Sequence, residues 1–308
     1  MSIERESSQI ASTPTEPTLE LPEDKENKTR LQEEANTKAF ALYKSILQGA
    51  DMWDRYTDSS EARAILQPTI DRLKQSGNLL GYLAIKSLNK FSVHIDVASA
   101  AMSEDQATLE RARKEILTGE QNQEVDSRFS TLGEALSLRL AYMADKIGVS
   151  VEELVSKNDS LSQKDRNSLN FRSKSLVEAL PDNKTKLDAQ FQAKLNAIKT
   201  YLRIRETNLK KTESIRGREG DEKYHAGMQA DVGTELQLLK SEGRWAEYLA
   251  LKGTIEPGIG KAPTDEGYWE KDLVLVALEE DMANLDAIRS VLTAEQVQSL
   301  ERMLSWSK

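Results

Sequence analysis

Hydrophobic positions gather most densely between residues 77 and 102, where only Lys86, Lys90 and Asp96 carry charge. Apolar side chains fall on nearly every face of this stretch, which is typical of a helix enclosed by other helices. Residues 91–97 also alternate as a strand would. No second segment with comparable alternation is present in the sequence to pair with such a strand. We therefore predict a buried helix, firmest over residues 79–88, and leave residues 89–102 open between helix and strand.

Elsewhere the apolar residues recur at steps of three and four, which is the period of an α-helix. Capping boxes are predicted at Ser103, Ser150 and Thr293, each followed three residues later by Gln or Glu. The pattern predicts an all-α fold, a bundle-like array of many helices. The expected helices cover residues 31–48, 58–76, 79–102, 103–118, 129–147, 161–180, 187–215, 228–242, 244–253, 268–290 and 294–306, with a further short helix opening at residue 150 and polar linkers or loops at 119–127, 217–227 and 253–267.

Composition changes along the chain and suggests three regions. Residues 1–30 hold Pro14, Pro17 and Pro22, many Ser, Thr and acidic residues and little to bury, so we predict a disordered tail. The Pro-Asp-Asn-Lys segment from Pro181 is the best candidate linker. It divides an N-terminal helical domain, residues 31–180, from a C-terminal helical domain, residues 181–308, which includes a long helix near 184–216.

The long helix carries an apolar seam, formed by Phe191, Leu195, Ile198 and Leu202. These residues are spaced almost as in a heptad repeat, so the seam could pack inside the chain or against a second copy. We list the four residues as candidate contacts of an oligomer.

A basic stripe runs beside the seam. Residues 194–218 contain eight Lys and Arg residues against Glu206 and Glu213, in a chain whose net charge is −9. Such a stripe could follow a phosphate backbone or meet an acidic helix, or it could simply be a solvated face. The candidate partner- or phosphate-binding residues are Lys199, Arg203, Lys210 and Lys211.

Composition narrows the chemistry that the chain can perform. The chain has 308 residues, of which 30% are charged, and contains no cysteine, which excludes disulfides and cysteine-ligated zinc. No signal peptide or membrane span is predicted, so we expect a cytoplasmic protein, with secretion or delivery to a host cell by a non-classical route left open.

Motifs that could carry catalysis are weak. The Gly258–Lys261 segment lacks the spacing of a phosphate-binding loop, and the two histidines, His94 and His225, lie far apart in the sequence. The acidic clusters at 152–153 and 279–281 read as solvated helix surface, because adjacent helical residues do not converge. Residues 140–154 resemble a helix-turn-helix, but the second helix begins with acidic residues that DNA phosphates would repel.

Residues 242–251 look like one unit of a helical repeat. No second copy is found at any fixed period, so a solenoid is not supported.

These observations favour a non-enzymatic protein of interaction or assembly, an adaptor or scaffold that binds a protein partner or itself, with no catalytic residue, cofactor or metal expected. One alternative is a nucleic-acid- or nucleocapsid-associated cofactor that uses the basic stripe, since the layout is similar to that of viral phosphoproteins. Another is a bacterial secreted effector with a disordered leader. An enzyme with a cleft under the 253–267 loop is the remaining possibility.

Overall fold

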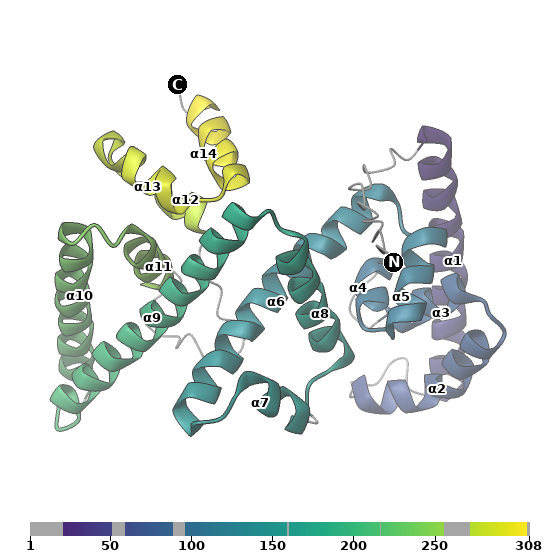
Figure 1. Ribbon diagram of the computed structural model, residues 1–308. Helices are drawn as coiled ribbons and strands as arrows, with labels where there is room; N and C mark the ends of the chain where they lie inside the picture. Colours follow the sequence, from purple (N-terminus) through teal and green to yellow (C-terminus); the bar gives the residue numbers. More distant parts are fainter. Residues whose placement is uncertain are drawn as a thin grey trace, which may run out of the picture. The chain divides into compact units, whose positions relative to one another are not determined.

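The computed structural model describes residues 21–50, 59–88, 96–158, 160–215, 217–255 and 272–306. Those residues form fourteen α-helices and one short 3-10 helix, and no strand occurs among them (Figure 1). The all-α prediction is therefore confirmed. Residues 1–20 of the predicted disordered tail lie outside the described part of the chain.

The chain divides into two compact units, Met1–Asp126 and Ser127–Lys308. The division falls within helix α6 (Gly119–Ile147) and does not coincide with the predicted linker at Pro181. Pro181 instead begins helix α9 (Pro181–Thr212), at a position where the missing N–H of proline costs no hydrogen bond. Lys194 of α9 pairs with Glu134 of α6 at 3.0 Å, so α9 belongs with the helices that precede it.

The first unit contains helices α1 (Pro22–Gly49), α2 (Ser59–Gln75), α3 (Leu79–Lys86), α4 (Val97–Met102) and α5 (Gln106–Glu115), followed by the start of α6. Helix α1 packs on α2 and α3, and α3 packs on α4 (Figure 1). Residues 22–30, predicted as part of the tail, are helical. The proline at the first helical position and the acidic residues Glu23 and Asp24 in the first turn both favour a helix start there.

The predicted buried helix is confirmed over Leu79–Lys86, where Leu83 and Ala84 are fully buried. Residues 97–102 are also a buried helix, which Asp96 caps by accepting a hydrogen bond from the Ser99 N–H. Residues 89–95, where helix and strand were left open, lie outside the described residues, as does His94.

The second unit contains the rest of α6 and the helices α7 (Val151–Lys157), α8 (Gln163–Glu178), α9, α10 (Arg218–Ser241) and α11 (Trp245–Ile255). It ends with α12 (Leu273–Ala277), the 3-10 helix η1 (Met282–Asn284), α13 (Leu285–Val291) and α14 (Ala294–Trp306). Helix α9 packs on α10 and α11, and α11 packs on α12 (Figure 1). The core of this unit includes Tyr201, Leu249, Leu251, Ile288 and Leu300.

Several predicted boundaries are corrected. Residues 119–127, predicted as a linker, belong to α6. Asp105, not Ser103, caps α5, because its carboxylate accepts from the Thr108 N–H at 2.9 Å. The predicted caps at Ser150 and Thr293 are confirmed, and the box at Thr293 is reciprocal with Gln296.

Two glycines predicted as part of a loop lie inside α10. A Cβ at Gly220 would come within 2.5 Å of the Ile215 carbonyl, and a Cβ at Gly227 within 2.2 Å of the Asn208 side chain. Close packing, rather than a turn, therefore requires glycine at both positions.

Candidate functional site

The apolar seam of α9 packs inside its own unit. Leu195 and Ile198 are 8% and 3% exposed, and they form one cluster with Leu138 of α6. Phe191 and Leu202, together with Ala141 and Tyr142 of α6, pack against that cluster. The seam residues therefore make an intramolecular helix contact, one of the two arrangements that their spacing allows.

The four candidate cations of the basic stripe each face a carboxylate of the same unit. The stripe therefore carries its own compensating negative charge, and much of its local excess is neutralised. The pairs are Lys199–Asp145 at 2.9 Å, Arg203–Glu235 at 3.6 Å, Lys210–Glu206 at 2.7 Å and Lys211–Asp231 at 3.2 Å.

An open groove of about 730 Å³ lies at the turn between α9 and α10. Its walls carry charges of both signs, including Arg205, Glu213 and Asp221, so it offers no consistent complement to one charged ligand. The exposed His225 lines it beside Tyr224, with ring centroids 5.3 Å apart.

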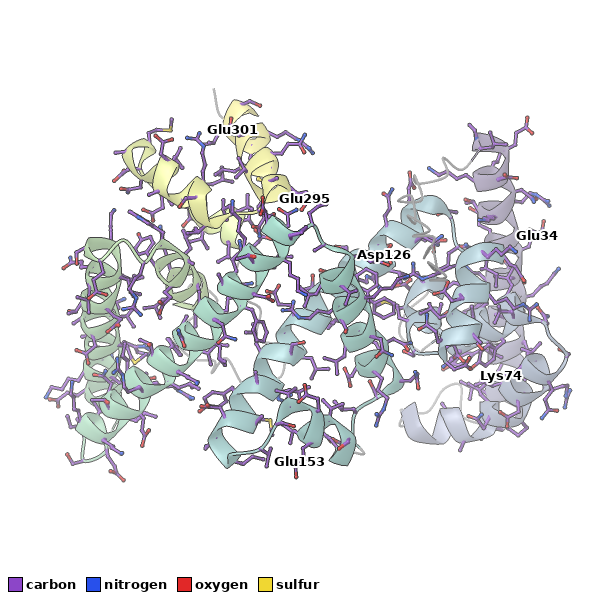
Figure 2. The ribbon with its side chains drawn as sticks, in the orientation of Figure 1. Glu34, Lys74, Asp126, Glu153, Glu295 and Glu301 are labelled. Carbon is purple, nitrogen blue, oxygen red and sulfur yellow. The ribbon has the colours of Figure 1, made fainter. Side chains whose placement is uncertain are left out.

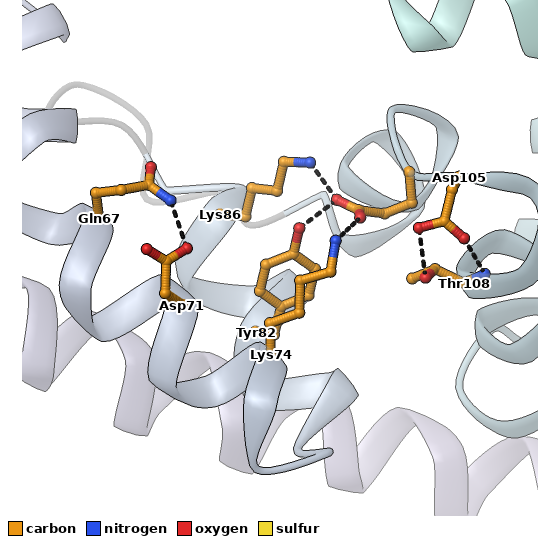
Figure 3. A network of polar contacts seen from close by, with 8 residues as sticks. Gln67, Asp71, Lys74, Tyr82, Lys86, Asp105 and Thr108 are labelled. Atoms are coloured by element: carbon orange, nitrogen blue, oxygen red, sulfur yellow. Dashed lines mark hydrogen bonds and ion pairs between the residues drawn. The ribbon is translucent and has the colours of Figure 1, made fainter.

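The most closed polar site of the first unit is a network around Glu104, whose side chain is 3% exposed. The Tyr82 hydroxyl donates to the Glu104 carboxylate at 2.6 Å. The ammonium group of Lys86 also pairs with that carboxylate, and the ammonium group of Lys74 lies 3.3 Å from it. Figure 3 shows Tyr82, Lys74 and Lys86 converging on this one carboxylate. The Lys74 Nζ also lies 5.4 Å from the centroid of the Tyr82 ring. The network joins the end of α2, the middle of α3 and the turn before α5.

The environment of Glu104 favours its charged form. Burial alone would raise the pKa of Glu104, but hydrogen bonds from Lys86 and Tyr82 and the charges of Lys86 and Lys74 lower it below the ordinary value. Burial and the hydrogen bond to Glu104 raise the pKa of Tyr82. The network is therefore a Glu104 carboxylate that accepts from the neutral Tyr82 phenol and pairs with two ammonium groups.

The second unit contains a network of the same composition around Glu280. The Tyr248 hydroxyl donates to Glu280 at 2.6 Å, Lys252 pairs with it at 2.5 Å, and Lys240 lies at 3.8 Å. The Lys240 Nζ is 5.9 Å from the centroid of the Tyr248 ring. The Glu280 side chain is 5% exposed, which corrects the prediction that residues 279–281 are solvated surface. Its neighbour Glu279 is 43% exposed.

Both networks are chemically complete. Each buried carboxylate already receives one tyrosine hydroxyl and two ammonium groups, so little capacity remains to bind a substrate or a cation. Within the described ranges, no group of three or more His, Asp or Glu residues is placed to hold a metal. Such networks fix the relative positions of the three segments that they join.

The sequence contained a signal for these networks. Residues 77–86 and 243–252 share a Gly followed five residues later by Tyr-Leu-Ala, an aliphatic residue and Lys. The two segments match without a gap, so the prediction that residues 242–251 have no second copy is wrong. The spacing beyond them differs, because Tyr82 and Glu104 are 22 residues apart, whereas Tyr248 and Glu280 are 32 apart.

No helix among the described residues is both long enough and apolar enough to cross a membrane. Comparisons of the chain with protein-family models, with curated proteins and with solved structures give no match.

Proposed function

We propose that this protein is a non-enzymatic helical interaction or assembly protein, an adaptor or scaffold that binds a protein partner. The observation that supports this proposal is that two closed polar networks, those of Glu104 and Glu280, have the same composition, and that each carboxylate already interacts with a tyrosine hydroxyl and two lysine ammonium groups. A carboxylate in that position has little capacity left to bind or activate a substrate. The carboxylates of Glu104 and Glu280 are instead committed to holding helices together.

The surfaces that remain for a partner are charged helix faces. Figure 2 shows acidic side chains such as Glu34, Glu153 and Glu301 spread over separate helices. Pairs four residues apart, such as Arg218–Glu222 and Lys223–Glu219, make α10 a highly charged helix. Surfaces of this kind select a partner by complementary charge and speed its association.

The proposal is tested by chemical crosslinking of the full chain in its native cells, followed by reconstitution with each recovered protein and calorimetry. We expect saturable binding at a fixed stoichiometry. A variant with both Glu104→Ala and Glu280→Ala should lose binding because its helices are no longer held in place, whereas the exposed control Lys174→Ala, on α8, should retain both folding and binding.

Two outcomes would contradict the proposal. One is a chain that recovers no saturable protein partner. The other is RNA binding that falls steeply with salt and is abolished by combined Lys199→Ala, Arg203→Ala and Lys210→Ala, which would indicate the nucleic-acid function instead.

A further inference from the structure

We infer that the chain contains an internal duplication, two copies of one helical module joined by a helical connector. The first copy runs from α1 to the start of α6, and the second from α9 to α14. The connector comprises the rest of α6, α7 and α8. This inference concerns the architecture of the chain and does not depend on the proposed function.

The helices of the two copies correspond in order and in packing. The first four helices of one copy, α1 to α4, match the first four of the other, α9 to α12, in the same order. Helix α5 then matches η1 together with α13, and the start of α6 matches α14. In each copy the first helix packs on the second and third, and the third packs on the fourth. Both first helices begin at a Leu-Pro pair, in which the leucine precedes the helix.

The turn between the second and third helices is the same in both copies. Gly77 and Gly243 have φ of +74° and +70°, and the N–H of each donates to a lysine carbonyl, that of Lys74 or Lys240, at 3.2 Å. That lysine is a member of the Glu104 network in one copy and of the Glu280 network in the other. Backbone and side-chain features therefore recur together.

The start of the fourth helix also matches. Asp96 caps α4 and Asp272 caps α12, each through its own carboxylate. The buried glutamate follows each aspartate at the same distance along the chain, as Glu104 and Glu280.

A second network recurs at the other end of the module. Gln32 of α1 donates to the Ile116 carbonyl at 2.9 Å and to the Gln121 side chain at 2.8 Å. Lys28 donates to the Leu117 carbonyl at 2.9 Å, and Gln121 forms a reciprocal cap with Thr118.

The second copy repeats each of these hydrogen bonds. Gln190 of α9 donates to the Val291 carbonyl and to the Gln296 side chain, both at 2.8 Å. Lys186 donates to the Leu292 carbonyl at 2.6 Å. Gln296 forms the reciprocal cap with Thr293. The hydrogen bond from Lys25 to Glu120 has its counterpart in the hydrogen bond from Asn183 to Glu295. Glu295, at the start of α14, is labelled in Figure 2.

Independent packing of two helical units would not reproduce these details. Burial requires apolar residues at helical spacing but does not specify Tyr, Glu, Lys and Gln at matching positions. The copies differ where the connector packs on α9. When α1 and α9 are aligned on Gln32 and Gln190, the seam residues Phe191, Leu195, Ile198 and Leu202 of α9 correspond to Glu33, Thr37, Phe40 and Lys44 of α1. The seam is therefore a feature of the second copy alone, and it binds α6.

The experiment that tests the duplication is hydrogen exchange followed by mass spectrometry on the full chain, with matched variants in each copy. The variant Glu104→Gln should speed exchange in α2 and α3 about tenfold or more, because a charged buried hydrogen-bond network is weakened. Glu280→Gln should do the same in α10 and α11. A second matched pair of variants is Gln32→Ala and Gln190→Ala. The first should speed exchange in α1 and the start of α6, and the second should speed exchange in α9 and α14.

The duplication is supported if each pair alters corresponding helices by fold-changes that agree within about threefold. It is overturned if one variant of a pair has no effect on its own copy, or if the affected helices do not correspond. If Glu104→Gln or Glu280→Gln unfolds the chain, the milder pair Tyr82→Phe and Tyr248→Phe gives the same comparison. The exposed Lys223→Ala variant is the control and should leave both copies unchanged.

Discussion

A carboxylate withdrawn from water must recover its lost hydration from protein donors, and Glu104 and Glu280 do so with the same residue types. In each case a tyrosine supplies a short hydrogen bond and two lysines supply the opposite charge. The lysine side chains stay partly in water, between 23% and 50% exposed, while the two carboxylates are only 3% and 5% exposed. At the residue scale, each glutamate is therefore held by several partners at once.

The first prediction concerns Glu104→Gln and Glu280→Gln. At neutral pH each variant should lower the free energy of unfolding of its unit by about 2 kcal/mol, since hydrogen bonds to a charged group are worth more than neutral ones. Urea titration monitored by circular dichroism measures this loss. The exposed control Glu222→Gln, which pairs only with Arg218 at the surface, should show no measurable change.

The same carboxylates predict the acid limit of stability. The pKa of each carboxylate is lower in the folded state than in the unfolded chain, so the folded state binds fewer protons. The stabilisation that each carboxylate gives the folded state is therefore complete above the ordinary pKa of 4.5. It is lost as the pH falls through the lower folded-state value. Melting temperatures between pH 7 and pH 3 should therefore fall less steeply in the two Gln variants than in the wild type, and an equally steep fall would contradict this.

Individual helices reveal how much the sequence can predict. Apolar spacing correctly identifies α3, α9 and α14, because a buried face at helical period has few alternatives. It misplaces the start of α1 and of α6, where polar residues such as Lys28 and Gln121 bond to another segment that local pattern cannot reveal. It also misreads Glu280, because burial of a charge depends on partners brought together by the fold.

The next prediction uses two glycines with opposite roles. Gly243→Ala should destabilise the second unit by about 1 kcal/mol, because φ of +70° is unfavourable for alanine. Gly233→Ala, within α10, has no atom within 4 Å of the new Cβ and should stabilise that unit by about 0.5–1 kcal/mol. Thermal unfolding distinguishes the two signs, and Gly77→Ala should behave like Gly243→Ala in the first unit.

The seam gives a prediction about the contact between α6 and α9. Leu195→Ala should cost about 2–4 kcal/mol, because a cavity opens beside Leu138 and Ile198, and should leave the molar mass in solution unchanged. Leu209→Ala, on the same helix but 47% exposed, is the matched control and should have little effect. A change in molar mass measured by light scattering, with stability unaltered, would restore the seam as an oligomer contact.

At the scale of the whole molecule, the inferred duplication accounts for the two helical domains that the sequence predicts on either side of Pro181. Composition alone detects Pro181, which begins the second copy, but it cannot detect that α6 to α8 form a connector grouped with that copy. The two copies do not align at one offset over their full length, because the spacing between tyrosine and glutamate differs between them. Matching contacts, rather than matching spacing, reveal the relationship.

The most direct test of the account is an NMR titration of the glutamate side-chain carboxyl carbons in the full chain. We predict that Glu104 and Glu280 both titrate below the exposed glutamates, that Lys86→Ala raises the pKa of Glu104 alone, and that Lys252→Ala raises the pKa of Glu280 alone. A titration in which either carboxyl behaves like an exposed glutamate, or in which the lysine variants leave both unchanged, would contradict the presence of two equivalent networks.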